Sequence, residues 1–377
     1  MASDGTAAAS ASRKDDHVRL AAAQRREPAT RNDFDDVELV HHALDGIDAS
    51  EVDLRTRVAH WTWRSPLYLN GMTGGTPKTT AVNRELAVAA RETGMPMGSG
   101  SIGIALDDPD AAAGFRVIRE ENPAGLVFAN IGVGRSADEA RRAVDLLEAD
   151  ALQVHLNAVQ ETIMPEGSRA FSGWAASLEA IVAASEVPVI VKEVGFGLSR
   201  RTLERLRDMG VRLADVSGSG GTDFARIENA RRSASDYAFL IGHGSSAVRS
   251  LLDAPEDGPT PLGSGGVRTP LDAVRALALG ARAVGVAGAF LAPAVSGGAA
   301  EVVAVVRTWT SQLRDLHALF GAPTPEALLT KDVLVHGGVR EFCELRGIDA
   351  RALARRSEDQ HPRAGGQPAG PDDRRTT

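Results

Sequence analysis

Residues 261–288 read PLGSGGVRTPLDAVRALALGARAVGVAG and contain a complete strand–turn–helix–strand unit. An apolar start leads into a glycine-rich turn, and the helical segment that follows has Pro270 near its beginning and Gly280 at its end. Proline early and glycine late is the usual asymmetry of a helix. A second apolar run follows at residues 283–288. The stretch therefore predicts two parallel strands joined by a helix.

The same alternation recurs along most of the chain. A second helical segment, residues 136–149, places Ser136 and Glu139 at the spacing of a capping box. The candidate strands span residues 65–72, 95–100, 125–132, 151–157, 187–195, 213–221, 261–266 and 283–288. Eight such units favour an α/β fold of the (β/α)8, or TIM-barrel, type over an open doubly wound sheet. A doubly wound sheet should show one dominant glycine-rich first turn, whereas glycines here recur at most strand ends.

Composition excludes several classes of protein. The chain has 377 residues, a formal net charge of −8 and one cysteine, Cys343. A negative charge argues against a general nucleic-acid binder, and a single cysteine can form neither an internal disulfide nor a thiolate metal cage. No apolar run is long enough to span a membrane. We expect a cytoplasmic protein that binds a small molecule rather than nucleic acid or a membrane.

The chain divides into four predicted parts. Residues 1–12 and 356–377 are rich in small, charged, glycine or proline residues and are expected to be flexible tails. Residues 13–64 precede the barrel and contain the charged cluster RKDDH; they form a segment that caps the substrate. Residues 65–350 hold the catalytic barrel and C-terminal helices packed outside it.

Two glycine-rich turns predict a phosphate site. They follow the seventh and eighth strands, where barrels of this type often bind phosphate, because backbone N–H groups and a helix N-terminus can approach an anion there. The candidate residues are Gly265, Gly266, Arg268, Ala287 and Gly288. The alternative is a pair of tight turns without a ligand. With NGMTGGT at residues 70–76, SGSGGT at residues 217–222 and Lys192, these turns suggest an extended cofactor lying across the barrel mouth.

Polar residues continue past the end of the fourth strand, in VHLNAVQETIMPEG at residues 154–167. Strand alternation sends His155 and Asn157 into the barrel, and Gln160 and Glu161 follow in the loop. A polar core in which His155 and Asn157 bond one another is one explanation. A carboxylate near oxygen ligands also suits Mg²⁺, which proteins usually hold with one or two carboxylates and substrate phosphates. If the segment before the barrel folds over the mouth, Arg13, Lys14 and His17 of the RKDDH cluster would complete a diphosphate clamp; the alternative is a solvated, charged helix.

Eight motifs, in this order, resemble the type 2 isopentenyl-diphosphate isomerases, which are FMN-dependent (β/α)8 enzymes. The resemblance runs from about residue 13 to about residue 350. It is carried by RKDDHVRLA, FDDVELVHHAL, NGMTGGT, HLNAVQETIMPEG, VKEVGFGLS, ADVSGSGGTDFARIEN, SGGVRTPLDAVRALALGARAVG and KDVLVHGGVREFCELRGID.

The resemblance implies a role for each matching residue. FMN would be held by Met72, Thr73, Gly74, Gly75, Ser101, Asn130, Lys192, Ser217 and Thr222, and at its phosphate by Gly265, Gly266, Arg268, Ala287 and Gly288. The substrate would contact Arg13, Lys14, His17, Ser101, His155 and Gln160, with His155, Asn157 and Gln160 as the catalytic group that positions the substrate and Glu161 as the Mg²⁺ ligand. It also implies NADPH as the reductant of the flavin and a homotetramer or larger homo-oligomer.

Two departures leave alternatives open. Ile102 and Gly103 stand where the family usually has longer polar or flexible side chains, often Gln and Arg. His243 and Ser246 stand where it commonly has Trp and, in many members, Pro or Ser. Because of Ile102 and Gly103, one diphosphate contact is missing or supplied from elsewhere. An FMN-dependent oxidoreductase acting on a small hydroxy acid, or a flavin-binding relative without catalysis, stays open beside the isomerase.

Overall fold

The computed structural model describes residues 13–17, 19–21, 23–24, 31–72 and 74–358. Eight parallel strands close into a barrel in chain order, so that the last pairs with the first. The strands are β4 (Leu67–Leu69), β5 (Met97–Gly98), β6 (Val127–Gly132), β7 (Ala151–His155), β8 (Val189–Lys192), β9 (Leu213–Asp215), β10 (Thr260–Ser264) and β11 (Val284–Val286). The predicted (β/α)8 fold is confirmed. The strands are shorter than predicted, because most of the glycine and polar residues at their predicted carboxyl ends belong to loops.

Helices follow the strands and cover the outside of the barrel. They are α2 (Pro77–Thr93), α3 (Gly103–Asp107), α4 (Ala113–Glu121), α5 (Ala137–Leu147), α6 (Ala158–Ile163), α7 (Trp174–Ala184), α8 (Arg200–Asp208), α9 (Phe224–Arg231), α10 (Ala247–Leu252), α11 (Pro270–Ala278), α12 (Gly288–Ser296), α13 (Gly298–Leu319), α14 (Gly337–Arg346) and α15 (Ala350–Leu353). The Ser136–Glu139 capping box forms at the start of α5. Among the described residues, no helix is both long enough and apolar enough to cross a membrane.

The side chains of the strands alternate between two cores. Leu152 and Val154 of β7 lie in the large apolar cluster outside the barrel, whereas Ala151 packs with Tyr68 and Phe128 inside it. Gln153 also points inward, where its Oε1 accepts a hydrogen bond from the Nδ2 of Asn130 at 3.2 Å. This is the period-two pattern of a barrel strand.

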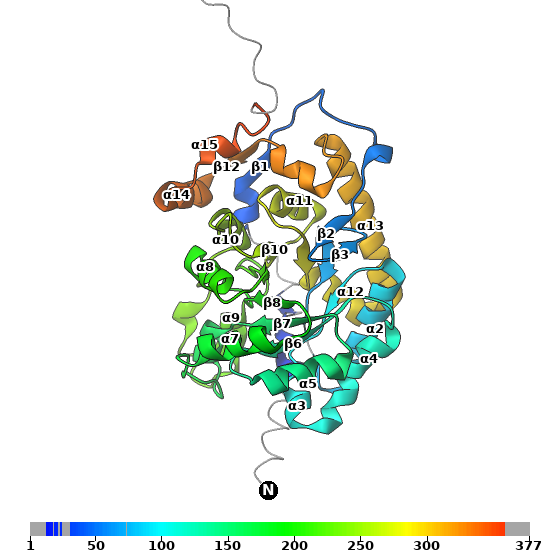
Figure 1. Cartoon of the computed structure of the whole chain (residues 1–377), viewed down its shortest axis with the longest axis vertical. Coiled ribbons are helices and arrows are strands. Elements are labelled where there is room, and N and C mark those ends of the chain that lie inside the picture. The colour runs from blue at the N-terminus through cyan, green and yellow to red at the C-terminus, as the bar shows by residue number, and fades with distance from the viewer. Residues whose placement is uncertain (1–12, 18, 22, 25–30, 73, 359–377) are drawn as a thin grey trace, which may run out of the picture.

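Residues 13–64 divide between both ends of the barrel. Residues 13–17, 19–21 and 23–24 are helical and lie at the carboxyl ends of the strands. The hairpin of β2 (Thr56–Val58) and β3 (Trp61–Trp63) closes the opposite end, where the buried ring of Trp63 packs on Tyr68 and Phe128. A different pair, β1 (Val37–Leu39) and β12 (Val333–Val335), joins the N-terminal segment to the C-terminal extension, as Figure 1 shows near α14 and α15.

The predicted tails lie almost wholly outside the described residues. Residues 1–12 and 359–377 are not described. Residues 356–358 are, and the N–H of Ser357 donates to the Oδ1 of Asp332 at 2.8 Å, so the folded part of the chain extends at least to residue 358.

Candidate functional site

A cavity of about 1800 Å³ lies at the carboxyl ends of the barrel strands. Every strand or the loop after it contributes to its wall, through Asn70, Ser99, Asn130, His155, Lys192, Ser217, Ser264 and Ala287 among others. Ligand pockets usually have volumes of ~300–1,000 Å³. This cavity therefore has room for a cofactor and a substrate together, and it occupies the end at which TIM-barrel enzymes carry out their chemistry.

Most of the residues predicted as functional line this cavity. They are Arg13, Lys14, His17, Met72, Ser101, Asn130, His155, Asn157, Gln160, Glu161, Lys192, Ser217, Thr222, Gly265, Gly266, Arg268, Ala287 and Gly288. Gly74 and Gly75 are not in the wall. A Cβ atom at Gly74 would lie 2.1 Å from the ring of Phe115, so this glycine allows the loop to pack on α4. Thr73 lies outside the described residues.

The N-terminal helical residues bring positive charge into the cavity. Lys14 is 8% exposed, and its Nζ lies 3.5 Å from the carbonyl oxygen of Ser101. Burial, together with the neighbouring charge of Arg13, lowers the pKa of Lys14 to about 7. Arg13 lies 3.6 Å from the carboxylate of Glu166. The cluster thus places a fixed cation beside one that can gain or lose a proton near neutral pH.

His17 reaches a buried acid that sequence reasoning missed. Its Nε2 lies 2.9 Å from the Oε1 of Glu228 on α9, a carboxylate with no solvent exposure. The same oxygen accepts a hydrogen bond from the Nε2 of Gln160 at 2.8 Å, and Arg231 pairs with the other oxygen. Glu228 therefore connects the N-terminal residues, the loop after β7 and α9. In the sequence, Glu228 is marked only by its place in the motif ARIEN. Its burial cannot be predicted from the neighbouring residues of the helix.

His155 is held neutral at the mouth of the barrel. Its Nδ1 donates to the Oδ1 of Asn130 at 2.8 Å, which leaves the lone pair of the neutral ring on Nε2. Burial, aided by the charge of Lys192, lowers the pKa of His155 to about 3. Because the ring is not a cation at neutral pH, it can accept a hydrogen bond but does not act as a ready acid.

Glu161 lies at the start of α6 (Ala158–Ile163) with its carboxylate facing the cavity. One oxygen accepts from the Nδ2 of Asn157 at 3.1 Å, and the other accepts from the backbone N–H of Ser168 at 2.8 Å. Within the described ranges, no group of three or more His, Cys, Asp or Glu could hold a metal ion. A metal on Glu161 would therefore have to take its other ligands from water and from a bound substrate.

Lys192 and Asp215 form the buried polar centre of the barrel mouth. Lys192 is 6% exposed, burial lowers its pKa, and its Nζ donates to the carbonyl oxygen of Glu193 at 2.7 Å. Asp215 has no exposure and accepts hydrogen bonds from Tyr68 at 2.6 Å and from Ser264 at 2.7 Å. The hydrogen bonds of Asp215 thus join the carboxyl end of β9 to that of β10 and to β4, at the base of the loops after β9 and β10.

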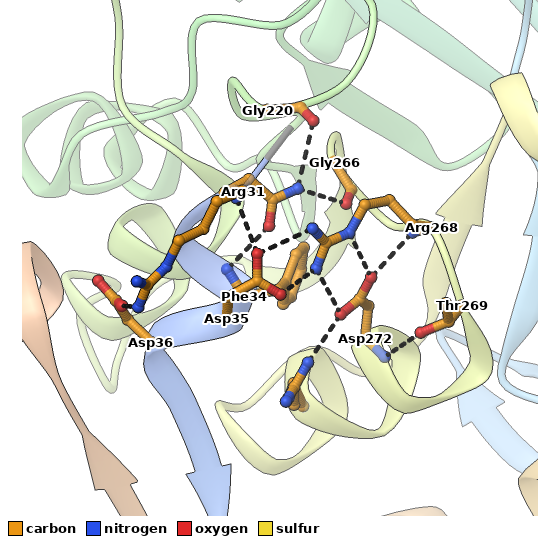
Figure 2. A network of polar contacts seen from close by, with 11 residues as sticks. Arg31, Phe34, Asp35, Asp36, Gly220, Gly266, Arg268, Thr269 and Asp272 are labelled. Atoms are coloured by element: carbon orange, nitrogen blue, oxygen red, sulfur yellow. Dashed lines mark hydrogen bonds and ion pairs between the residues drawn. The ribbon is translucent and has the colours of Figure 1, made fainter. Parts of the chain in front are cut away.

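The first of the two predicted phosphate turns, which follows β10, makes a close backbone contact with the turn after β9. Gly265 has a φ of +90°, and a Cβ atom there would lie 1.9 Å from the carbonyl oxygen of Gly218. Only glycine allows this approach of the two loops. Arg268 also lies here, but its guanidinium pairs with the carboxylates of Asp35 and Asp272 (Figure 2). The sequence predicted the position of Arg268 in the wall but not these two partners.

The two departures from the family pattern have different surroundings. Ile102 is fully buried, and its N–H donates to the carbonyl oxygen of Asn130 at 2.8 Å. A Cβ atom at Gly103 would lie 3.1 Å from a guanidinium nitrogen of Arg135, which itself pairs with Asp107. His243 is exposed on the cavity wall. A longer side chain at position 103 would therefore have to displace Arg135.

Comparison with known proteins identifies the family. The model of the FMN-dependent dehydrogenase family matches residues 130–335. Isopentenyl-diphosphate delta-isomerase of Kitasatospora griseola is 59% identical over 348 residues, which cover 92% of this chain and 96% of that protein. The enzyme of the same name from Streptomyces sp. (strain CL190) is 56% identical, over 92% of this chain and 96% of that protein. The one from Nocardia farcinica (strain IFM 10152) is 54% identical, over 94% of this chain and 98% of that protein.

Solved structures support the fold at much lower identity. A mandelate oxidase superposes with a TM-score of 0.57 at 19% identity, over 81% of this chain and 90% of that one. A flavocytochrome b2 variant superposes with a TM-score of 0.61 at 15% identity, over 97% of this chain and 87% of that one. From its near-full-length relatives and its family-model match, the chain belongs to the type 2, FMN-dependent isopentenyl-diphosphate delta-isomerases.

Proposed function

We propose that the chain interconverts isopentenyl diphosphate and dimethylallyl diphosphate by a 1,3-proton shift, without net redox change. The observation that carries the proposal is that two sets of groups suited to anions line one cavity. The glycine turns after β10 and β11 contribute Gly265, Gly266 and Gly288, and the N-terminal helical residues contribute Arg13 and Lys14. A phosphorylated cofactor and a diphosphate substrate would need such a pair of sites.

The residues present fit FMN. The turns after β10 and β11 line the cavity with Gly265, Gly266 and Gly288, and glycine turns of this kind favour phosphate. The hydroxyl of Ser99 is buried in the cavity wall and has no hydrogen-bond partner among the described residues, so it is available to a polar ring edge. Lys192 supplies a positive charge from the barrel interior, which would favour an anionic ring system.

The reaction needs an acid, a base and protection of developing positive charge. Protonation of an unactivated alkene develops positive charge at a tertiary carbon. Reduced FMN, when bound, would supply an electron-rich face to stabilise that charge and a nitrogen able to exchange a proton. The chain's own part is to exclude water and to orient the alkene. Neutral His155 accepts hydrogen bonds, and Gln160, fixed by Glu228, positions the substrate or a water that relays a proton.

The diphosphate would be held away from the reacting carbons. Glu161 would bind Mg²⁺ together with the diphosphate oxygens, and Lys14 and Arg13 would pair with the remaining charge. Binding free energy gained at this end of the substrate then serves to orient the alkene. NADPH as the reductant of FMN, and assembly into a homotetramer or larger oligomer, are parts of the same proposal.

One assay tests the reaction. The chain is incubated without oxygen in heavy water with FMN, a reductant, Mg²⁺ and isopentenyl diphosphate. Deuterated dimethylallyl diphosphate, formed without stoichiometric oxidation of the flavin, is the expected result. Bound flavin without this product would contradict the isomerase. In a parallel incubation with oxidised FMN and a small hydroxy acid, without the reductant, oxidation of one hydroxy acid per flavin reduced would indicate the oxidoreductase instead.

A further inference from the structure

Residues 32–36, NDFDD, lie against the glycine turns after β9 and β10, and Figure 2 shows Asp35 of this segment joined to Arg268. We call them the clasp segment. Asp33–Asp36 form the 3-10 helix η1, which Asn32 caps by accepting a hydrogen bond from the N–H of Phe34 at 3.0 Å. The Oδ2 of Asp35 accepts in return from the N–H of Asn32 at 3.0 Å. Phe34, 2% exposed, anchors the segment in the core.

Asp35 makes a two-pronged contact with Arg268. Its Oδ1 lies 2.6 Å from Nη2 and its Oδ2 lies 2.9 Å from Nη1 of that guanidinium. Asp272, only 1% exposed, holds the Nε edge of the same group at 3.0 Å and also accepts from Arg275. Paired carboxylate–guanidinium contacts of this type restrict orientation as well as adding attraction. Arg268 is therefore held from both sides, by the barrel and by the clasp segment.

Asn32 ties the two turns to each other. Its Nδ2 donates to the carbonyl oxygen of Gly266 at 2.9 Å and to that of Gly220 at 3.3 Å (Figure 2). Space between the turns is minimal, since a Cβ atom at Gly221 would lie 2.7 Å from the backbone nitrogen of Gly266. Losing the amide would leave two carbonyl oxygens without this shared donor. The clasp segment thus contacts the backbone of both turns through the side chain of Asn32, and it contacts the side chain of Arg268 through Asp35.

We propose that Asn32 and Asp35 are positioning residues that hold the turn after β10, one of the two predicted phosphate turns, against the turn after β9 and in the geometry that binds the phosphate monoester of the cofactor. The proposal rests on the proposed function in that FMN is the cofactor. Turns fixed before binding lose less conformational entropy when the phosphate arrives, so affinity for the phosphate end should depend on the clasp segment. Affinity for the flavin ring, at the other end of the cofactor, should not.

The test compares FMN with riboflavin, which lacks the phosphate. Dissociation constants for both are measured by fluorescence titration on the flavin-free full chain. We expect Asp35→Asn to raise the constant for FMN about tenfold, a change typical of losing a charge-assisted hydrogen bond, and to leave that for riboflavin within about twofold. Asp53→Asn is the matched control: Asp53 also pairs with an arginine, but this arginine, Arg55, is outside the cavity wall whereas Arg268 is part of it, so both constants should stay unchanged.

A second variant keeps the proposal falsifiable if Asp35→Asn does not fold. Asn32→Ser retains a side-chain oxygen able to cap η1 but removes the amide donor to Gly266 and Gly220, and it should also weaken FMN selectively. A wild-type ratio of the FMN and riboflavin constants in the folded variants would overturn the clasp proposal alone. Failure of the wild-type chain to bind FMN would overturn both proposals, whereas FMN binding without isomerisation would overturn only the proposed function.

Discussion

The Nδ1 of His155 on β7 lies 2.8 Å from the Oδ1 of Asn130 on the neighbouring strand β6. The Nδ2 of Asn130 donates in turn to Gln153, which fixes the orientation of the amide. This arrangement selects the tautomer of the imidazole with its proton on Nδ1. The histidine that the sequence suggested as part of a catalytic group is therefore an oriented, neutral hydrogen-bond acceptor.

Asn130→Asp should raise the pKa of His155, because it places a carboxylate next to a ring whose pKa burial lowers to about 3. An NMR titration of histidine-labelled protein measures this change, with His155→Gln used to assign the signal. In the unmodified chain, the unfolded state binds a proton at this position between about pH 6.5 and 3 and the native state does not. The contribution of His155 to the free energy of unfolding should thus decrease as pH falls through that window; a ring that titrates near pH 6.5 in the native chain would contradict this.

Lys14 should take up a proton when a diphosphate binds. Its pKa is about 7 before binding, because of burial and the nearby Arg13, and an adjacent anion will raise it. Calorimetry with inorganic diphosphate at pH 8, in two buffers of different ionisation enthalpy, should show uptake approaching one proton. Lys14→Arg, which is always charged, should bind without uptake. No uptake by the wild-type chain would refute the assignment.

Glu161→Gln should raise the Mg²⁺ concentration needed for half-maximal isomerisation by about tenfold or more, since it removes the carboxylate ligand. The visible spectrum of bound flavin should not change. Glu179→Gln, at an exposed position of α7 outside the cavity wall, is the control for loss of one negative charge. Equal Mg²⁺ dependence in the wild-type chain and Glu161→Gln would eliminate the metal assignment.

Trp63→Ala should lower the free energy of unfolding by about 3–5 kcal/mol, the range for removing a large buried aromatic side chain. Trp63 is 2% exposed and packs on Tyr68 and Phe128 at the closed end of the barrel. Urea denaturation of the flavin-free chain measures the loss. Trp61→Ala, in the same hairpin but only partly buried, should cost clearly less. Similar costs at the two positions would mean that the hairpin does not close the barrel as a packed unit.

The sequence by itself determined the elements and the end of the barrel at which the site lies. Apolar runs, helix-start signals such as Ser136 with Glu139, and glycines at strand ends are local features, and they predicted all eight strands. Strand alternation is also local, and it correctly sent Gln153 and His155 inward. Because carboxyl ends of parallel strands meet at one end of a barrel, the loops could be predicted to form one site.

Only the tertiary structure decided which residues from distant segments meet. Glu228 contacts Gln160, 68 positions away in the sequence, and His17, 211 positions away. Asp35 pairs with Arg268, 233 positions away. No local periodicity encodes such pairs, since they depend on how the segment before the barrel packs against the completed barrel. Gly74 is a further example: a glycine-rich turn favours close approach but does not specify what approaches it, and only the tertiary structure shows that Phe115 lies against this glycine.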